Sequence, residues 1–343
     1  MTMPSLFLSH GAPTLPLTDT PARAFLQQLG HTLERPKAIL VISAHWETTV
    51  PTVNAVDSNE TIHDFGGFPR ALYDMRYPAL GSPKLAACVA ERLRADGFDC
   101  NVDPRRGLDH GAWVPLILMY PQADIPVLQL SVQPHLGPEH HLRVGRALAP
   151  LRDEGVLIIG SGSLTHDLSE FRGHDPNDPA PDWVNKFADW FHAALMRNQI
   201  DELIDYRLQA PFATKNHPSE EHLLPLYAAL GAAGERASPE RLHASSTYSV
   251  LRMDVYAFQG PQDSPCKLLP NQSHLRLNPS RATPNNAQTK KYPHIRHAYS
   301  CGKFKLARAR SIVMGKASDS AAPTRTASGS GREPFKDLRH SRL

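Results

Sequence analysis

Apolar runs recur along the first 160 residues of the chain, and three of them are followed by a histidine. The runs are Ser5-Leu6-Phe7-Leu8-Ser9, Ala38-Ile39-Leu40-Val41-Ile42-Ser43 and Val156-Leu157-Ile158-Ile159. Apolar, branched runs of this length predict strands buried on both faces, as in a mostly parallel sheet. Residues 125–132 predict a fourth such strand. Residues 248–258 alternate in their second half and predict a less buried strand that closes the domain.

Helical patterns lie between these strands. Thr20-Pro21 and Ser82-Pro83 each combine a capping side chain with a proline at the first helical position, which is typical of a helix start. Helices are also predicted over 140–152 and 183–197, and a loop that feeds a short buried helix over 110–120. This order predicts an α/β fold, a single-domain three-layer sandwich around a mostly parallel central sheet.

The composition of the chain changes at Pro261. Residues 261–343 hold 16 Lys and Arg against 4 Asp and Glu, whereas residues 1–260 hold 21 against 30, so the formal net charge of +3 hides an acidic domain and a basic tail. The tail has no sustained period and too little apolar surface to pack. We therefore expect one folded domain over 1–260 and a disordered, low-complexity tail over 261–343.

Charge and cysteine content exclude several classes of protein. An acidic domain argues against nucleic acid or an anionic membrane as its partner. The four cysteines form no CxxC pair, which predicts neither a disulfide framework nor a thiolate metal site. No basic and apolar leader begins the chain, and no apolar stretch approaches the length of a membrane span, so the expected location is the cytoplasm.

Four histidines are candidate ligands of one metal ion. His10, His45 and His166 follow predicted strands, and open α/β sheets hold their ligands beyond the carboxyl ends of the strands. His222 follows Ser219, a candidate helix cap, and the positive end of the helix dipole would keep a first-turn imidazole neutral and able to bind a metal. Any one of these residues alone would be an ordinary loop histidine, but their repeated placement favours a shared site.

A histidine for proton transfer is expected in the segment 108–113. There Asp109 or a backbone carbonyl would orient the imidazole of His110 beside Trp113, and a histidine held in this way can move protons. A surface Asp–His pair is the alternative interpretation. The glycines and serines of 160–163 do not indicate a phosphate-binding loop or a nucleophilic serine, because the P-loop lysine and the spacing of a nucleophile elbow are both missing.

The segment 61–69 is a candidate substrate pocket. It combines His63, Asp64, two phenylalanines and adjacent glycines. This composition suits a pocket for an aromatic substrate with a close backbone approach, and it equally suits an ordinary glycine-rich turn.

In combination, five of these segments resemble the class III extradiol ring-cleavage dioxygenases, in particular the branch similar to 4,5-DOPA dioxygenase. The segments are 8–13, 43–46, 61–69, 108–113 and 221–226. The resemblance covers roughly residues 4–260, and the tail has no counterpart. It implies a single α/β catalytic domain with one divalent metal ion, a catecholic substrate and O2.

The resemblance also implies roles for individual residues. His10 and His45 match the paired metal-binding histidines, and His222 matches the last ligand. His166 matches an active-site histidine that is either a further ligand or the base, and His110 matches a second-sphere histidine at the substrate. The expected catalytic residues are therefore His110 and His166, and the expected metal ligands are His10, His45, His166 and His222.

The metal itself stays open between zinc and Fe(II). Protocatechuate-type relatives have a carboxylate as last ligand, whereas this chain offers His222, and an all-histidine set suits zinc as well as iron. Activation of O2 needs a redox-active ion, which favours Fe(II). Two alternatives remain, a zinc-dependent hydrolase and a non-catalytic metal-binding interaction protein of the same fold.

Overall fold

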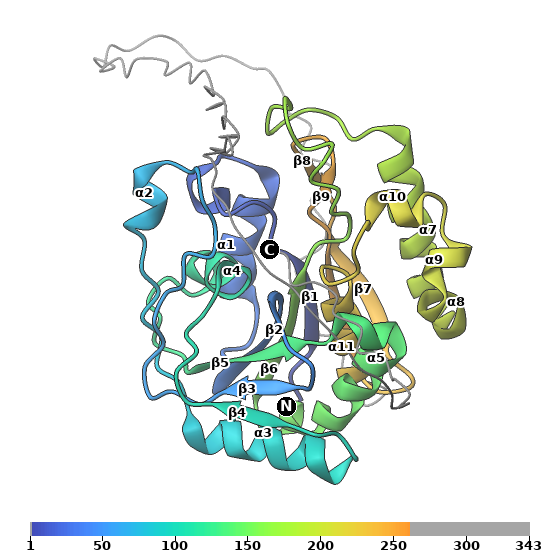
Figure 1. Ribbon diagram of the computed structural model, residues 1–343. Coiled ribbons are helices and arrows are strands. Elements are labelled where there is room, and N and C mark those ends of the chain that lie inside the picture. The colour runs from blue at the N-terminus through green and yellow to red at the C-terminus, as the bar shows by residue number, and fades with distance from the viewer. Residues whose placement is uncertain (1, 261–343) are drawn as a thin grey trace, which may run out of the picture. The chain divides into compact units, whose positions relative to one another are not determined.

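One eight-stranded sheet runs through the molecule in the computed structural model, which describes residues 2–260 (Figure 1). Along the sheet the strands follow the order β4-β3-β5-β2-β6-β1-β10-β7. Their bounds are β1 Ser5–Ser9, β2 Ala38–Glu47, β3 Thr52–Asn54, β4 Asn101–Asp103, β5 Val127–Val132, β6 Val156–Gly162, β7 Ser238–His243 and β10 Val255–Gln259. Strands β8 (Ser246–Thr247) and β9 (Leu251–Arg252) form a separate pair.

The four central strands are parallel, as the apolar runs predict. β5, β2, β6 and β1 pair in parallel, β3 also pairs in parallel with β4, and the antiparallel pairs are β3 with β5, β1 with β10 and β10 with β7. Every residue of β1, β5 and β6 is buried. This burial on both faces explains why these strands are apolar without alternation.

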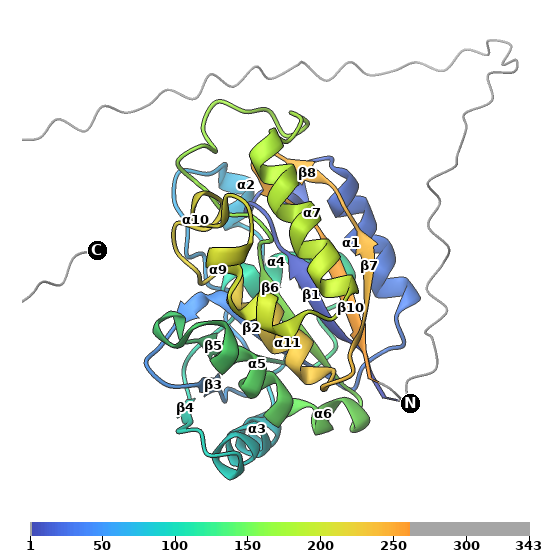
Figure 2. The same ribbon diagram turned by 90° about the vertical axis from the view of Figure 1, so that its right-hand side faces the viewer.

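Helices cover both faces of the sheet. The helices are α1 Pro21–Thr32, α2 Arg70–Tyr73, α3 Pro83–Ala95, α4 His110–Met119, α5 Gly137–Leu148, α6 Pro150–Asp153, α7 Asp182–Met196, α8 Ile200–Ile204, α9 Tyr206–Gln209, α10 Ala213–Asn216 and α11 Leu224–Ala232, with 3-10 turns at Leu15–Leu17 and Pro134–Leu136. Figure 2 views the molecule from the side of α5, α7 and α11.

Alternate residues of each strand point into different cores. Ile39 and Val41 of β2 join the core that α1 and α4 cover, whereas Leu40 and Ile42 join the core under α3 and α5. Phe7 of β1 lies in a third cluster, with residues of α7 and α11. The three-layer α/β sandwich predicted from the sequence is therefore confirmed.

Two of the three predicted helix caps are present. Thr20 accepts a hydrogen bond from the backbone N–H of Arg23 at the start of α1, and Ser82 accepts one from Leu85 at the start of α3. The expected helix over 140–152 is split into α5 and α6 at Pro150, because proline has no N–H for the helical ladder.

The predictions for three element boundaries were wrong. α4 begins at His110 itself rather than after a loop. Ser219 caps no helix, since its hydroxyl donates to Glu221 and α11 begins only at Leu224. The closing strand is limited to β10, and its residues 255–258 are buried because it pairs with both β1 and β7.

Positive φ angles explain why no strand spans the whole of 248–258. Tyr248 and Ser249 have φ angles of 51° and 65°, values that a strand does not allow. Within residues 2–260 no helix has the length and apolarity that a membrane crossing needs. The expected tail, 261–343, lies outside the described residues.

Candidate metal centre

Three of the four predicted ligands converge at the carboxyl end of the central strands. Nε2 of His45 lies 3.0 Å from Nε2 of His10 and 3.2 Å from Nε2 of His222. The three residues form a group whose ligand atoms all lie within 4.8 Å of one another. The prediction that these remote histidines meet at one point is therefore consistent with the fold.

Each of the three histidines comes from a different kind of element. His10 follows β1, and its backbone N–H bonds to Gly162 of β6. His45 lies inside β2 rather than after it, in a stretch where the pairing register with β5 shifts. Such irregularities re-aim a side chain out of the regular pleat. His222 lies in the turn before α11, where its carbonyl accepts from the N–H of Ser163.

The glycines of β6 allow His222 to approach the sheet. A Cβ at Gly162 would lie 2.0 Å from the carbonyl oxygen of His222, and a Cβ at Gly160 would lie 2.0 Å from that of Pro225. Only glycine fits at such distances. The role of these two glycines is therefore packing, not the cradling of a phosphate.

Protein partners fix the tautomers of two of the imidazoles. Nδ1 of His10 lies 3.0 Å from the hydroxyl of Ser161, which donates its own hydrogen to the carbonyl of Gly111. Nδ1 of His222 lies 2.9 Å from the carboxylate of Glu221. Each Nδ1 is therefore the donor, and each Nε2 presents its lone pair to the cluster.

Burial keeps these imidazoles neutral. It lowers the pKa of His10 and of His222 well below the ordinary value and that of His45 to about 3, with the neighbouring histidines adding to the effect. Neutral imidazole is the form that binds a metal. His222 is thus neutral as expected, but the cause is burial among histidines and not the helix terminus that the sequence suggested.

The geometry fits a single divalent ion. Two nitrogens bound to one tetrahedral ion at about 2.0–2.1 Å lie about 3.3 Å apart, close to the two Nε2 separations here. Lone pairs that face one another at these distances repel unless a cation or a proton lies between them. The residues present therefore suit a metal, whose identity the donor set does not decide.

His166 lies beside the cluster, on the His222 side. Its ring stacks on that of His222, with centroids 3.4 Å apart and planes inclined by 11°. It shares a second ligand group with Glu221 and His222, rather than the group that contains His10 and His45. Burial lowers the pKa of His166 to about 4, against the opposing effect of Glu221.

His110 lies beside His45 and is the first residue of α4. Its ring centroid is 3.9 Å from that of His45 and 5.4 Å from that of His10. Nδ1 of His110 lies 2.9 Å from Oδ1 of Asp64. Burial alone would raise the pKa of Asp64, but the contacts with His110 outweigh it and lower this pKa to about 2.

Asp109 does not orient His110, contrary to one of the expectations from sequence. Its buried carboxylate accepts from the hydroxyl of Ser43, from the side-chain amide of Gln129 and from Arg106, and it caps α4 through the N–H of Ala112. These bonds occupy both oxygens. Asp109 therefore holds the start of α4 in place, while Asp64 contacts the imidazole.

Aromatic side chains border His110, as expected for the segment 61–69. The ring of Phe65 lies 5.6 Å from that of His110 and also contacts Phe68, Tyr73 and Trp113. The neighbouring glycines make no close approach to the described chain, since a Cβ at either one would meet no atom within 4 Å. The segment thus supplies an apolar wall beside the proton-transfer candidate.

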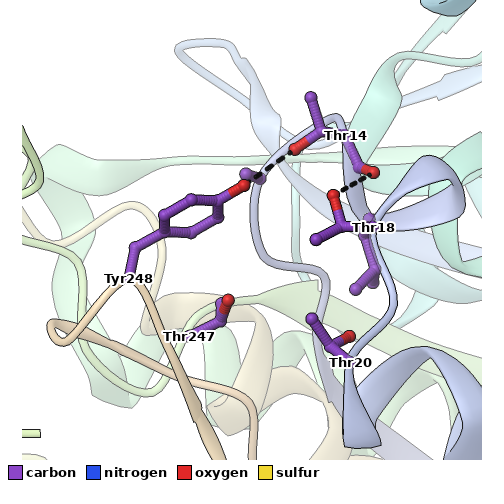
Figure 3. Close-up of a pocket in the computed structure, with 7 residues that line it drawn as sticks. Thr14, Thr18, Thr20, Thr247 and Tyr248 are labelled. Carbon is purple, nitrogen blue, oxygen red and sulfur yellow. Dashed lines mark hydrogen bonds between the residues drawn. The ribbon is translucent and has the colours of Figure 1, made fainter. Parts of the chain in front are cut away.

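The loop after His10 is held by hydroxyl groups. Figure 3 shows Tyr248 pointing at Thr14 across a small pocket, and the two hydroxyl oxygens are 3.4 Å apart. Thr18 donates to the carbonyl of Thr14. These contacts join the loop to the turn with positive φ at Tyr248 and so restrain the backbone beyond His10.

Reasoning from the sequence missed the residues that orient the histidines. Sequence patterns assigned Ser43 and Ser161 no orienting role, and they singled out neither Arg106 nor Gln129, because each of the four has a partner that is remote in the chain. Asp64 and Glu221 carried a weak signal, since each lies beside a histidine in a candidate motif.

Comparisons with known proteins show the family of this chain. The family model described as the catalytic LigB subunit of aromatic ring-opening dioxygenase matches residues 4–258. A 4,5-DOPA dioxygenase extradiol of Beta vulgaris is 49% identical over 259 residues, which are 74% of this chain and 96% of the relative. One of Escherichia coli K12 is 44% identical over 234 residues, 67% of this chain and 85% of the relative.

A solved structure supports the fold. The crystal structure of an uncharacterized protein from Escherichia coli K12 is 35% identical, with a TM-score of 0.63, and the match covers 74% of this chain and 99% of that one. These findings do not favour a hydrolase or a non-catalytic protein. The chain belongs to the LigB family of aromatic ring-opening dioxygenases, and within it to the extradiol branch that is similar to 4,5-DOPA dioxygenase.

Proposed function

We propose that this protein opens the ring of a catechol beside one hydroxyl, with O2, at a divalent metal held by His10, His45 and His222. The observation that carries the proposal is the convergence of their three Nε2 atoms. Relatives named 4,5-DOPA dioxygenase extradiol match over 95–96% of their length. Their names suggest a catechol that bears an amino-acid side chain as the substrate.

The proposed ion of the working enzyme is Fe(II). Three imidazoles suit iron and zinc alike. The chemistry that the ion supplies when bound is chelation of both catechol oxygens and, for Fe(II), electron transfer to O2, which Zn²⁺ does not provide.

His110 is the proposed acceptor of a phenolic proton. Its Nδ1 faces Asp64, so its Nε2 is the atom left to take the proton. Its ring lies against His45, which places it next to a proposed ligand. Imidazole is the side chain most often used for proton transfer at a reacting group. The neighbouring Phe65 ring would contact the substrate and exclude water.

His166 completes the proposed site, as base or as fourth ligand. The stacking on His222 favours the role of base, because the ligand atom of His166 groups with Glu221 and not with the other two histidines. The variant His166→Gln separates the two roles. Loss of a base lowers kcat and leaves metal affinity near that of the wild type, whereas loss of a ligand lowers both.

The experiment that tests the function is anaerobic loading with Fe(II) or, separately, with Zn(II). Air and DOPA or another catechol are then added, while O2 uptake and the yellow ring-opened product are recorded. We expect O2 uptake and product together, with Fe(II) only. The variant His45→Ala should abolish both, and the exposed His174, paired with Asp178, provides the control His174→Ala.

Two outcomes would contradict the proposal. One is a ferrous protein that takes up no O2 with any catechol while it cleaves an amide or ester. The other is full turnover in His45→Ala. The proposal also includes a cytoplasmic location, a catalytic domain over 1–260, and a tail over 261–343 without a part in catalysis.

A further inference from the structure

We propose that Asp64 is a positioning residue that holds two histidines of the site at once, the ligand His45 and the proton-transfer residue His110. This inference rests on the proposed function for the roles of the two histidines. The contacts themselves come from the structure alone.

The two carboxylate oxygens of Asp64 have separate partners. Oδ1 lies 2.9 Å from Nδ1 of His110 and accepts a hydrogen bond from the backbone N–H of the same residue at 3.0 Å. Oδ2 lies 3.7 Å from Nδ1 of His45. One carboxylate therefore faces the Nδ1 atoms of both imidazoles, whose centroids are 3.9 Å apart.

The contact with the backbone of His110 fixes more than a side chain. His110 is the first residue of α4, so its N–H has no partner within the helix. Asp64 satisfies this N–H and contacts the imidazole of the same residue, which restrains both the helix start and the rotation of the ring. Within residues 2–260 no aligned hydrogen bond reaches Nδ1 of His110, so its 2.9 Å contact with Oδ1 of Asp64 is a close charge contact and the nearest restraint on this nitrogen.

The backbone that carries Asp64 is attached to the backbone that carries His110. Ile62 donates its N–H to Leu108, and Leu108 donates its N–H to Glu60. Trp113 of α4 donates its indole N–H to the carbonyl of Ile62. A Cβ at Gly107 would lie 2.2 Å from the carbonyl oxygen of Glu60, so the two segments are in direct contact.

This attachment explains how a half-exposed loop can position catalytic groups. An orienting partner is effective only when its own position is fixed. Removal of a carboxylate that orients a metal-binding histidine typically lowers the metal affinity or the activity of a metalloenzyme by roughly 10- to 100-fold. Asp64 acts in this way on His45 and on His110 together, whereas Glu221 contacts Nδ1 of His222.

The test compares Asp64→Asn and Asp64→Glu with the wild type, all loaded with zinc for spectroscopy and with Fe(II) for kinetics. A chelator competition gives the metal affinity. Nitrogen-15 NMR of histidine-labelled protein gives the tautomer of His110, and His110→Gln identifies its signal. The matched control is Asp74→Asn, directly after α2, where the exposed Asp74 pairs with Arg70.

We expect three changes in Asp64→Asn. Metal affinity falls about 10-fold or more, the proton of His110 is no longer confined to Nδ1, and kcat falls more than KM rises. Asp64→Glu keeps a carboxylate and restores part of each loss. Asp74→Asn matches the wild type in all three measurements.

Unchanged metal affinity and an unchanged tautomer in Asp64→Asn would overturn the inference. So would an Nε2–H tautomer of His110 in the wild type, a result that decides the matter even if the variants do not fold. Neither readout needs turnover. A wild type without dioxygenase activity would therefore refute the proposed function and leave the inference about Asp64 open to its own test.

Discussion

At the scale of single residues, the histidines of the site differ in what holds their second ring nitrogen. Nδ1 of His10 donates to a neutral hydroxyl, that of Ser161, and Nδ1 of His222 donates to a carboxylate, that of Glu221. A hydrogen bond to a charged acceptor is roughly twice as strong as a neutral one. The two ligands should therefore depend unequally on their partners.

We predict that Glu221→Ala weakens metal binding more than Ser161→Ala does. The expected loss for Glu221→Ala is about 10- to 100-fold, because the carboxylate both fixes the tautomer of His222 and offsets the charge of the ion. Chelator competition measures the two affinities, with the exposed Glu91 providing the control Glu91→Ala. Equal losses, or a larger one in Ser161→Ala, would refute the ranking.

A second prediction concerns pH and a histidine outside the site. His141 is buried, accepts from the N–H of Gln133 and donates to the carbonyl of Gly137, and burial lowers its pKa to about 3. The pKa of an unfolded histidine is about 6.5. The contribution of neutral His141 to the free energy of unfolding is therefore fully present above about pH 6.5 and is lost as the pH falls from 6.5 towards 3.

The expected loss from His141 between pH 7 and pH 5 is about 2 kcal/mol in the free energy of unfolding. The variant His141→Gln retains a donor and an acceptor but does not titrate. Between pH 7 and pH 5 its free energy of unfolding should therefore fall by about 2 kcal/mol less than that of the wild type. Urea unfolding at the two pH values measures both proteins. The same loss in both would show that His141 does not contribute.

At the scale of elements, strand β6 and the turn before α11 position the centre together. β6 has glycine at the two positions where this segment crosses it, and the crossing brings His222 towards His45. Neither element could place His222 alone. The sequence Gly160-Ser161-Gly162 thus encodes a close packing contact together with the hydroxyl that orients His10.

We predict that Gly162→Ala destabilises the fold and displaces His222. The added methyl group would lie 2.0 Å from the carbonyl oxygen of His222, a backbone atom that cannot give way without moving the ligand. Overpacking of this kind costs about 1–3 kcal/mol, and metal affinity should fall with it. Gly66→Ala is the matched control, since its methyl group would meet open space.

Urea unfolding and chelator competition measure the two glycine variants. A Gly162→Ala protein with the metal affinity of the wild type would mean that the turn before α11 shifts without loss of the site. Gly66→Ala should match the wild type in both measurements.

At the scale of the whole molecule, all the residues of the proposed site lie between His10 and His222. The family match ends at residue 258, near the end of β10. We therefore predict that a chain ending at residue 260 binds Fe(II) and takes up O2 with catechol as the full chain does. Loss of activity in the shortened chain, with its fold intact by circular dichroism, would assign the segment 261–343 a role.

The sequence alone determined the central strands and the two capped helices, and it predicted that histidines after the strands lie close together. It could do so because burial on both faces makes strands apolar, and because parallel strands end at the same edge of a sheet. His10 follows β1 directly, as the apolar run predicts, whereas His45 lies inside β2 at a register irregularity that the run does not predict.

The tertiary structure decided which groups act on those histidines. It selected Asp64 over Asp109 as the partner of His110, stacked His166 on His222, and made β10 an interior strand. These outcomes depend on distances and directions between side chains that are remote along the chain. Periodicity and local capping signals report only on neighbours in sequence, so they contain no information about such contacts.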